Sequence, residues 1–121
     1  MIEKRGAGVL MPVFALPSGY SSGNFGKCAY EFVDILSACG FSYWQVLPFC
    51  LPDEFNSPYK SFSAFSVNPY FIDLPTLYEG GLLTQEELLA ARQDTPYSCE
   101  FDRLRKERME LLALAASRVT D

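Results

Sequence analysis

Apolar and polar residues form blocks that predict a strand, a helix and a second strand in the first half of the chain. The first strand is expected at residues 8–11, before a loop that starts at Pro12. Residues 25–39 then place apolar side chains three and four positions apart, the spacing of an amphipathic helix. Asn24 is the expected N-cap of this helix and Gly40 its expected C-terminal cap. The apolar positions are Phe25, Cys28, Ala29, Phe32, Ile35, Leu36 and Cys39.

The second strand is expected at residues 43–47. This β-favouring run ends at Pro48 and is typical of a strand covered on both faces. Two strands joined through a helix by short connections form a βαβ unit, so the fold class is α/β and the strands should be parallel. A buried amide costs a few kcal/mol unless it is bonded, so Gln45 predicts a polar network that either supports the next loop or touches a ligand.

Residues 56–69 fit neither a helix nor a strand. Pro58 and Pro69 push the residues before them out of the helical region, and small hydroxyl residues alternate with aromatic ones between the two prolines. Aromatic faces with hydroxyls between them suit a sugar, which has apolar faces and a hydroxyl rim. Asn68 is expected to hydrogen-bond the backbone of its own turn, with a direct ligand role as the alternative. Phe62 and Phe65 are expected in the core.

The second half of the chain is predicted to be mainly helical. Residues 70–74 are expected to form a short extended segment that Pro75 limits. Thr84 and Glu87 form a capping box for a helix over about residues 85–92. A last helix is expected over about residues 100–119, with one apolar stripe and one face of mixed charge, which we interpret as a solvated surface.

Composition narrows the possible functions of this chain. A net charge of −5 disfavours nucleic acid and acidic membrane surfaces as partners. No apolar run approaches the length of a membrane span, and the first residues lack a secretory signal, so we expect a cytoplasmic protein. The 121 residues include no histidine, which excludes a Cys/His zinc site and a Ser/His/Asp triad within them. The four cysteines have no metal-ligand spacing.

Several runs in the first ninety residues share one order and one spacing with a known family. They resemble the N-terminal signature of the 4-alpha-glucanotransferases, also called amylomaltases or disproportionating enzymes. The resemblance covers roughly residues 6–90, and Asn56 stands where aspartate is commoner in the family. The runs are Gly8-Val9-Leu10, Leu16-Pro17-Ser18, Gly23-Asn24-Phe25-Gly26, Tyr43-Trp44-Gln45-Val46-Leu47-Pro48, Ser57-Pro58-Tyr59, Ser61-Phe62-Ser63-Ala64-Phe65, Asn68-Pro69-Tyr70 and Ile72-Asp73-Leu74.

The resemblance implies a (β/α)8 TIM barrel of about 250 residues or more, of which this chain holds the opening βαβ portion with insertion helices. Residues 1–121 would then be the N-terminal part of a catalytic barrel. Within it, residues 6–76 would contain the first two βα units and the substrate loop, and residues 77–121 a helical insertion. We therefore expect the remainder of the same polypeptide to be a partner of this chain.

The resemblance also implies an activity and a set of binding residues. Family members transfer alpha-1,4-glucan segments from maltooligosaccharides to the 4-hydroxyl of an acceptor sugar by a retaining double displacement, without a metal or organic cofactor. Tyr59 matches the family tyrosine that packs on a glucose ring, and Ser57 could hydrogen-bond a sugar hydroxyl. Gln45 and Asn68 complete the expected substrate-binding set. For Tyr59, the alternative is a buried residue that anchors the loop.

No catalytic residue is expected in this chain. Retaining transfer needs two carboxyl groups about 5 to 5.5 Å apart, and the family's carboxylates lie beyond residue 121. Asp53 and Glu54 are adjacent, so in an extended loop they would point apart. Two other functions stay open, namely a glucan-binding module without catalysis and a structural remnant without a ligand.

Overall fold

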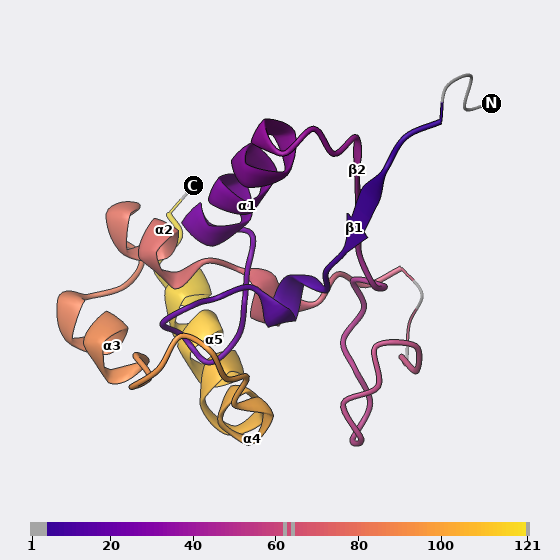
Figure 1. The fold of residues 1–121 in the computed structure, drawn as a ribbon. Helices are drawn as coiled ribbons and strands as arrows, with labels where there is room; N and C mark the ends of the chain where they lie inside the picture. Colours follow the sequence, from indigo (N-terminus) through magenta and orange to yellow (C-terminus); the bar gives the residue numbers. More distant parts are fainter. Residues whose placement is uncertain (1–4, 62, 64, 121) are drawn as a thin grey trace.

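The computed structural model describes residues 5–61, 63 and 65–120. Its first half contains two strands, β1 (Gly8–Leu10) and β2 (Tyr43–Gln45), and one long helix, α1 (Lys27–Ala38). The strands are parallel neighbours in one sheet, with Val9 paired to Trp44. The predicted βαβ unit is therefore confirmed, and Figure 1 shows α1 lying beside the strand pair.

Both ends of α1 differ in detail from expectation. The N-cap is Gly26 instead of Asn24, and the Asn24 side chain is buried and accepts a hydrogen bond from the Gly26 N–H at 2.8 Å. Asn24 therefore shapes the turn before the helix instead of capping it. Gly40 has a φ of +80°, a left-handed conformation that favours glycine, so its predicted place just after the helix is confirmed.

The first hydrophobic cluster packs α1 against the loop that follows β1. The Phe32 and Trp44 rings meet edge to face at 5.0 Å, and Trp44 Nε1 donates to the Met11 carbonyl oxygen at 2.8 Å. This packing fixes β2 under the helix. Ile35 and Cys39, which were expected on the buried stripe, are exposed because α1 covers only two short strands. The buried members of the cluster are Val13, Leu16, Ala29 and Phe71.

The other face of the strand pair is open. Leu10, Tyr43 and Gln45 are all exposed, so the expectation that β2 is covered on both faces is wrong for this chain. The physical reason is that the described residues supply packing from α1 on one side only. β2 also ends at Gln45, two residues earlier than predicted.

The second half of the chain is helical, as predicted. It contains α2 (Leu74–Glu79), α3 (Gln85–Ala90) and a helix that runs through α4 (Phe101–Arg103), a π-helical segment (Leu104–Arg108) and α5 (Met109–Ser117). A second core cluster joins them through Leu74, Leu83 and Ala115. Figure 1 shows these helices gathered on the side of the molecule away from the strands.

The expected extended segment at residues 70–74 is wrong. A 3-10 turn (Pro69–Phe71) is followed by α2, whose N-cap Asp73 accepts from the Thr76 N–H at 3.1 Å and from the Thr76 hydroxyl at 2.7 Å. Pro75 lies in the first turn of α2, where its missing N–H leaves no helical hydrogen bond unmade. Proline therefore begins this helix instead of ending a strand.

The capping box of α3 is confirmed. The Thr84 hydroxyl accepts from the Glu87 N–H at 3.3 Å, and the Glu87 carboxylate accepts from the Thr84 N–H at 2.8 Å. The same carboxylate accepts from Arg118 at 2.6 and 2.7 Å, and this partner lowers the pKa of Glu87 to about 2. The pair joins α3 to the end of α5. Within the described residues, no helix has the length and apolar character that crossing a membrane requires.

Candidate functional site

The segment that follows β2 is a turn shaped by Asp53. Its Oδ1 accepts from the Phe55 N–H and from the Ser57 N–H, both at 3.0 Å. Asn56 lies between these two donors with a φ of +61°, a conformation that asparagine tolerates better than most residues. The expectation that Asp53 and Glu54 stand in an extended loop is therefore wrong, because the Asp53 carboxylate folds the backbone around itself.

This turn presents Tyr59 to solvent. Its side chain is 72% exposed, so the alternative of a buried loop anchor does not hold in this structure. Tyr59 lines an open hollow of about 780 Å³ on the surface of the loop. The other lining residues are Leu51, Pro52, Asp53, Glu54, Phe55, Lys60, Ser61, Tyr70 and Arg105.

The hollow has balanced charge. Asp53 and Glu54 contribute two carboxylates to its lining, and Lys60 and Arg105 contribute two cations. Such a lining offers hydrogen-bond donors and acceptors without favouring an ion of either sign. An aromatic ring beside these groups matches a ligand that is uncharged, rich in hydroxyls and partly apolar.

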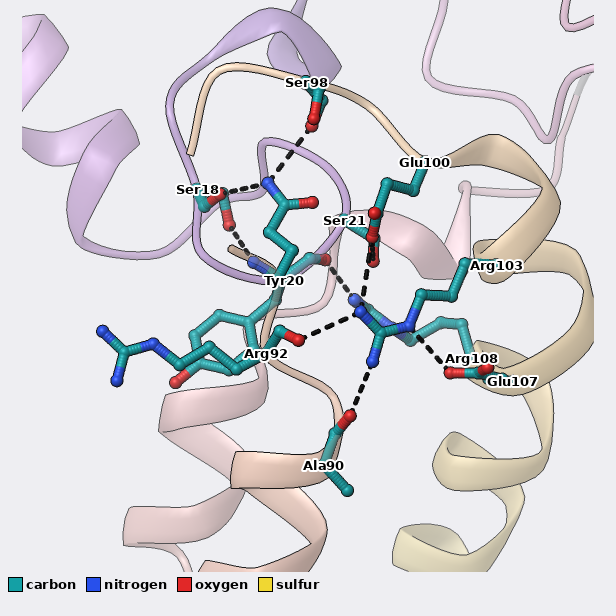
Figure 2. A network of polar contacts seen from close by, with 11 residues as sticks. Ser18, Tyr20, Ser21, Ala90, Arg92, Ser98, Glu100, Arg103, Glu107 and Arg108 are labelled. Atoms are coloured by element: carbon teal, nitrogen blue, oxygen red, sulfur yellow. Dashed lines mark hydrogen bonds and ion pairs between the residues drawn. The ribbon is translucent and has the colours of Figure 1, made fainter. Parts of the chain in front are cut away.

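A second loop, residues 17–24, is held by a network of polar contacts (Figure 2). The Ser21 hydroxyl donates to the Glu100 carboxylate at 2.9 Å, and the buried Gln93 donates through Nε2 to the Ser18 carbonyl oxygen at 2.7 Å. Arg108 donates to the Tyr20 carbonyl oxygen. The helical half of the chain therefore fixes this loop from three positions.

Arginines from the last helix dominate that network. Arg103 donates to the carbonyl oxygens of Ala90 and Arg92 and to the carboxylate of Glu107, as Figure 2 shows. Arg108 is only 4% exposed, and its burial lowers the pKa of its guanidinium to about 10. The mixed-charge face of this helix is thus only partly the solvated surface that its sequence predicted. Its arginines bond to neighbouring segments instead.

The other predicted substrate-binding residues lie at three different places. Ser57 is half-buried in the Asp53 turn, close in sequence to Tyr59. Asn68 is buried, and its Oδ1 accepts from the Tyr70 N–H at 2.9 Å, which confirms the turn predicted there. It lines a separate small hollow that shares Tyr70 with the larger one.

Gln45 lies apart from these residues, on the open face of β2. Its side chain is exposed, so water can satisfy the amide and the expected buried polar network is not required in this chain. The structure thus brings Ser57 and Tyr59 together on one turn and leaves Gln45 separate. The roles of all four residues toward a sugar stay predictions.

The aromatic residues of the loop also differ from expectation. Phe65 is 98% exposed, so its assignment to the core is wrong, because the loop extends away from both hydrophobic clusters. The same expectation for Phe62 falls on a residue outside the described ones. Two residues that sequence reasoning did not select, Asp53 and Arg105, prove to shape the loop. No local pattern marks Arg105, because its partner is 51 positions away.

The described residues offer no group of three or more His, Cys, Asp or Glu side chains that could hold a metal ion. The four cysteines are free thiols, and burial raises the pKa of Cys99.

The fold and the hollow together define an α/β protein with a ligand-sized hollow on the loop after its second strand. Loops at the carboxyl ends of parallel strands are where such proteins place their sites.

Comparison with known proteins assigns this α/β chain to a family. The sequence profile of the 4-alpha-glucanotransferase family matches residues 11–121. The chain is 48% identical to the 4-alpha-glucanotransferase of Streptococcus pneumoniae over 87 residues, which are 72% of this chain and 17% of that protein. It is 35% identical to a chloroplastic/amyloplastic 4-alpha-glucanotransferase of Arabidopsis thaliana over 119 residues, which are 98% of this chain and 20% of the relative.

A solved structure agrees with these relatives. An amylomaltase from Streptococcus agalactiae, in complex with acarbose, superposes with a TM-score of 0.87 at 33% identity. The match covers 94% of this chain and 23% of the amylomaltase. The chain therefore belongs to the 4-alpha-glucanotransferase family. It spans about a fifth of the length of the relatives that it matches.

Proposed function

We propose that this chain supplies substrate-binding loops to a 4-alpha-glucanotransferase. The complete enzyme would transfer alpha-1,4-glucan segments to the 4-hydroxyl of an acceptor sugar through a retaining double displacement. Its substrates would be maltooligosaccharides and longer alpha-1,4-glucans. Family membership supports the reaction class, and the share of the relatives that the chain matches supports its place within a longer polypeptide.

Within that enzyme, the two parallel strands would begin a (β/α)8 barrel. The open face of β1 and β2, with Leu10, Tyr43 and Gln45 exposed, would be covered by the rest of the barrel. Residues 6–76 would form the first two βα units with the substrate loop, and residues 77–121 a helical insertion. Gln45 would then point toward a barrel interior, where its amide finds partners.

The observation that carries the proposal is the exposed Tyr59 ring beside a charge-balanced hollow. A glucose unit has an apolar face that can stack on a phenol ring, while its hydroxyls exchange hydrogen bonds with carboxylates, amides and cations. Ser57 lies two residues before Tyr59, outside the lining of the hollow, and its proposed part is to bind a sugar hydroxyl at the edge of that site. Asn68 would act by shaping the base of the loop.

Chemistry would come from carboxylates elsewhere in the enzyme. In the first step, one carboxylate would attack the anomeric carbon to form a covalent glucosyl-enzyme, while the second carboxyl group protonates the leaving oxygen. In the second step, the acceptor 4-hydroxyl would give its proton to the second carboxylate and displace the first carboxylate from the anomeric carbon. We expect no catalytic group among residues 1–121 and no cofactor. A cytoplasmic location stays a prediction from the sequence.

Titration with maltoheptaose tests the proposed role of Tyr59. Wild-type chain and the Tyr59→Ala variant would be titrated by calorimetry, with Tyr97→Ala as a control for the loss of another exposed tyrosine. We expect Tyr59→Ala to weaken binding by roughly tenfold, the value of one aromatic contact, and Tyr97→Ala to leave it unchanged. Equal binding, or no binding, by wild type and Tyr59→Ala would contradict the proposal.

The alternative function is a glucan-binding module without catalysis. The same exposed ring and hollow favour this alternative, since a binding module requires a sugar site and no catalytic group. Longer coding sequence separates the two, because an enzyme requires further barrel strands with acidic residues at their ends.

A further inference from the structure

The turn that presents Tyr59 is built largely from its own hydrogen bonds. Asp53 accepts from two N–H groups of the turn, and the Asn56 N–H donates back to the Asp53 carbonyl oxygen at 3.0 Å. The Lys60 N–H closes a second turn on the Ser57 carbonyl oxygen at 3.4 Å. These bonds set the local shape of residues 53–60 but do not attach the turn to the helical half of the molecule.

Arg105 makes that attachment. From the π-helical segment, its Nη2 donates to the Glu54 carbonyl oxygen at 2.9 Å and to the Asn56 Oδ1. In the part of the chain that the structure describes, no other side chain from a distant element hydrogen-bonds residues 51–61. Arg105 also lines the same hollow as Tyr59, so the residue that attaches the loop borders the proposed sugar site.

The chemistry of arginine suits this position. Both bonds come from Nη2, whose two N–H groups lie in the fixed plane of the guanidinium, whereas the three donors of a lysine ammonium rotate at the end of a flexible stem and hold their acceptors less rigidly. The two acceptors flank Phe55, so holding both fixes the plane of the turn and not only its distance from the helix. Asn56 has a positive φ, a conformation that unsupported chain visits rarely, and its side-chain oxygen is one of the two groups that Arg105 holds.

We propose that Arg105 is the positioning residue for the Tyr59 loop. It acts through the turn of residues 53–57, which it holds in the arrangement that turns the Tyr59 ring toward the hollow and a bound glucan. This inference rests on the proposed function, and it deepens that function by assigning to the C-terminal helix a part in sugar affinity. Arg105 itself takes no part in bond cleavage.

Limited proteolysis measures the attachment without any sugar. Lys60 is exposed, and trypsin cleavage of the Lys60–Ser61 bond can be followed by mass spectrometry. Because both lost hydrogen bonds are solvent-exposed, we expect Arg105→Ala to speed this cleavage by roughly fivefold, the net effect of one ordinary hydrogen bond, and Arg105→Lys to fall between Arg105→Ala and wild type. Arg92→Ala, which removes an exposed arginine outside the loop, controls for the change in charge and should match wild type.

A variant that is expected to strengthen the attachment keeps the test valid even if Arg105→Ala also destabilises the fold. Asn56→Asp retains a side chain that accepts a positive φ and gives Arg105 a carboxylate partner. We expect slower cleavage at Lys60 and tighter maltoheptaose binding in Asn56→Asp. Both gains should disappear when Arg105→Ala is added, because the new carboxylate then has no guanidinium to hold.

Maltoheptaose titration completes the experiment. Arg105→Ala should weaken binding by roughly the same factor as it speeds cleavage, with circular dichroism unchanged and Arg105→Lys restoring part of both effects. Unchanged cleavage in Arg105→Ala would overturn the inference, and so would faster cleavage with unchanged affinity. If Tyr59→Ala binds as wild type does, the proposed function fails and the sugar-positioning role fails with it. If only Arg105→Ala binds normally, the proposed function stands and this inference alone is lost.

Discussion

Short polar side chains fix the backbone at four turns of the molecule. Asn24, Asp53, Asn68 and Asp73 each accept a hydrogen bond from a backbone N–H two to four residues later. Each bond satisfies a donor that irregular backbone would otherwise leave unpaired. Each of these turns therefore depends mainly on one side chain, and the substitution of such a residue should act on its own turn.

Glu87 provides a residue-scale prediction about acid stability. Its folded-state pKa of about 2 lies below the ordinary value of 4.5, so the Arg118 partnership stabilises the fold above pH 4.5 and is lost as the pH falls toward 2. Glu87→Gln should therefore lower the Tm at pH 7 and lose that difference near pH 2. Thermal melts across this range would check it, and a Tm difference that stays constant with pH would contradict it.

Single residues also show which parts of the site sequence reasoning can reach. The capping box of Thr84 and the turn at Asn68 were predicted correctly, since both partners lie within three positions of each other. Phe65 was misplaced, and Gln45 is exposed in this chain, because the burial of a residue depends on what covers it and not on its neighbours in sequence. Family resemblance selected Tyr59, which is exposed, and its role toward a sugar stays a prediction.

At the scale of elements, α1 and the long C-terminal helix were predictable from apolar spacing, and α2 was not. Asp73 and Pro75 interrupt the apolar spacing and so predict a break between elements, although Asp73 caps α2 and Pro75 lies in its first turn. The π-helical segment Leu104–Arg108 likewise has no signature in the predicted apolar stripe. Its arginines contact segments that lie far away in sequence, and such contacts leave no periodic trace.

The capping box of α3 gives a prediction at this scale. Thr84→Ala removes the hydroxyl that accepts from the Glu87 N–H, and we expect it to lower the free energy of unfolding by about 1 kcal/mol. Urea denaturation of wild type and variant measures this difference. Thr120→Ala, an exposed position beyond α5, is the matched control and should change little. Equal losses in both variants would show that the cap has no special role.

At the scale of the whole molecule, the proposed function gives this chain substrate-binding loops and places the catalytic carboxylates elsewhere in the enzyme. The purified 121-residue chain should therefore show no transfer of glucose units from maltotriose, measured by chromatography of the products. A full-length member of the family, assayed in parallel, provides the positive control. Detectable transfer by the chain would contradict the claim that its catalytic carboxylates lie elsewhere.

Attachment of the Tyr59 loop to a helix distant in sequence has a consequence for engineering. Grafting residues 51–61 alone onto another scaffold would carry over the Asp53 turn and leave behind the guanidinium that orients it. A transplant that retains the loop's geometry would have to include the stretch bearing Arg105. The smallest portable unit is therefore a pair of segments, the loop and the helical stretch that bears Arg105, which lie some forty residues apart in the sequence.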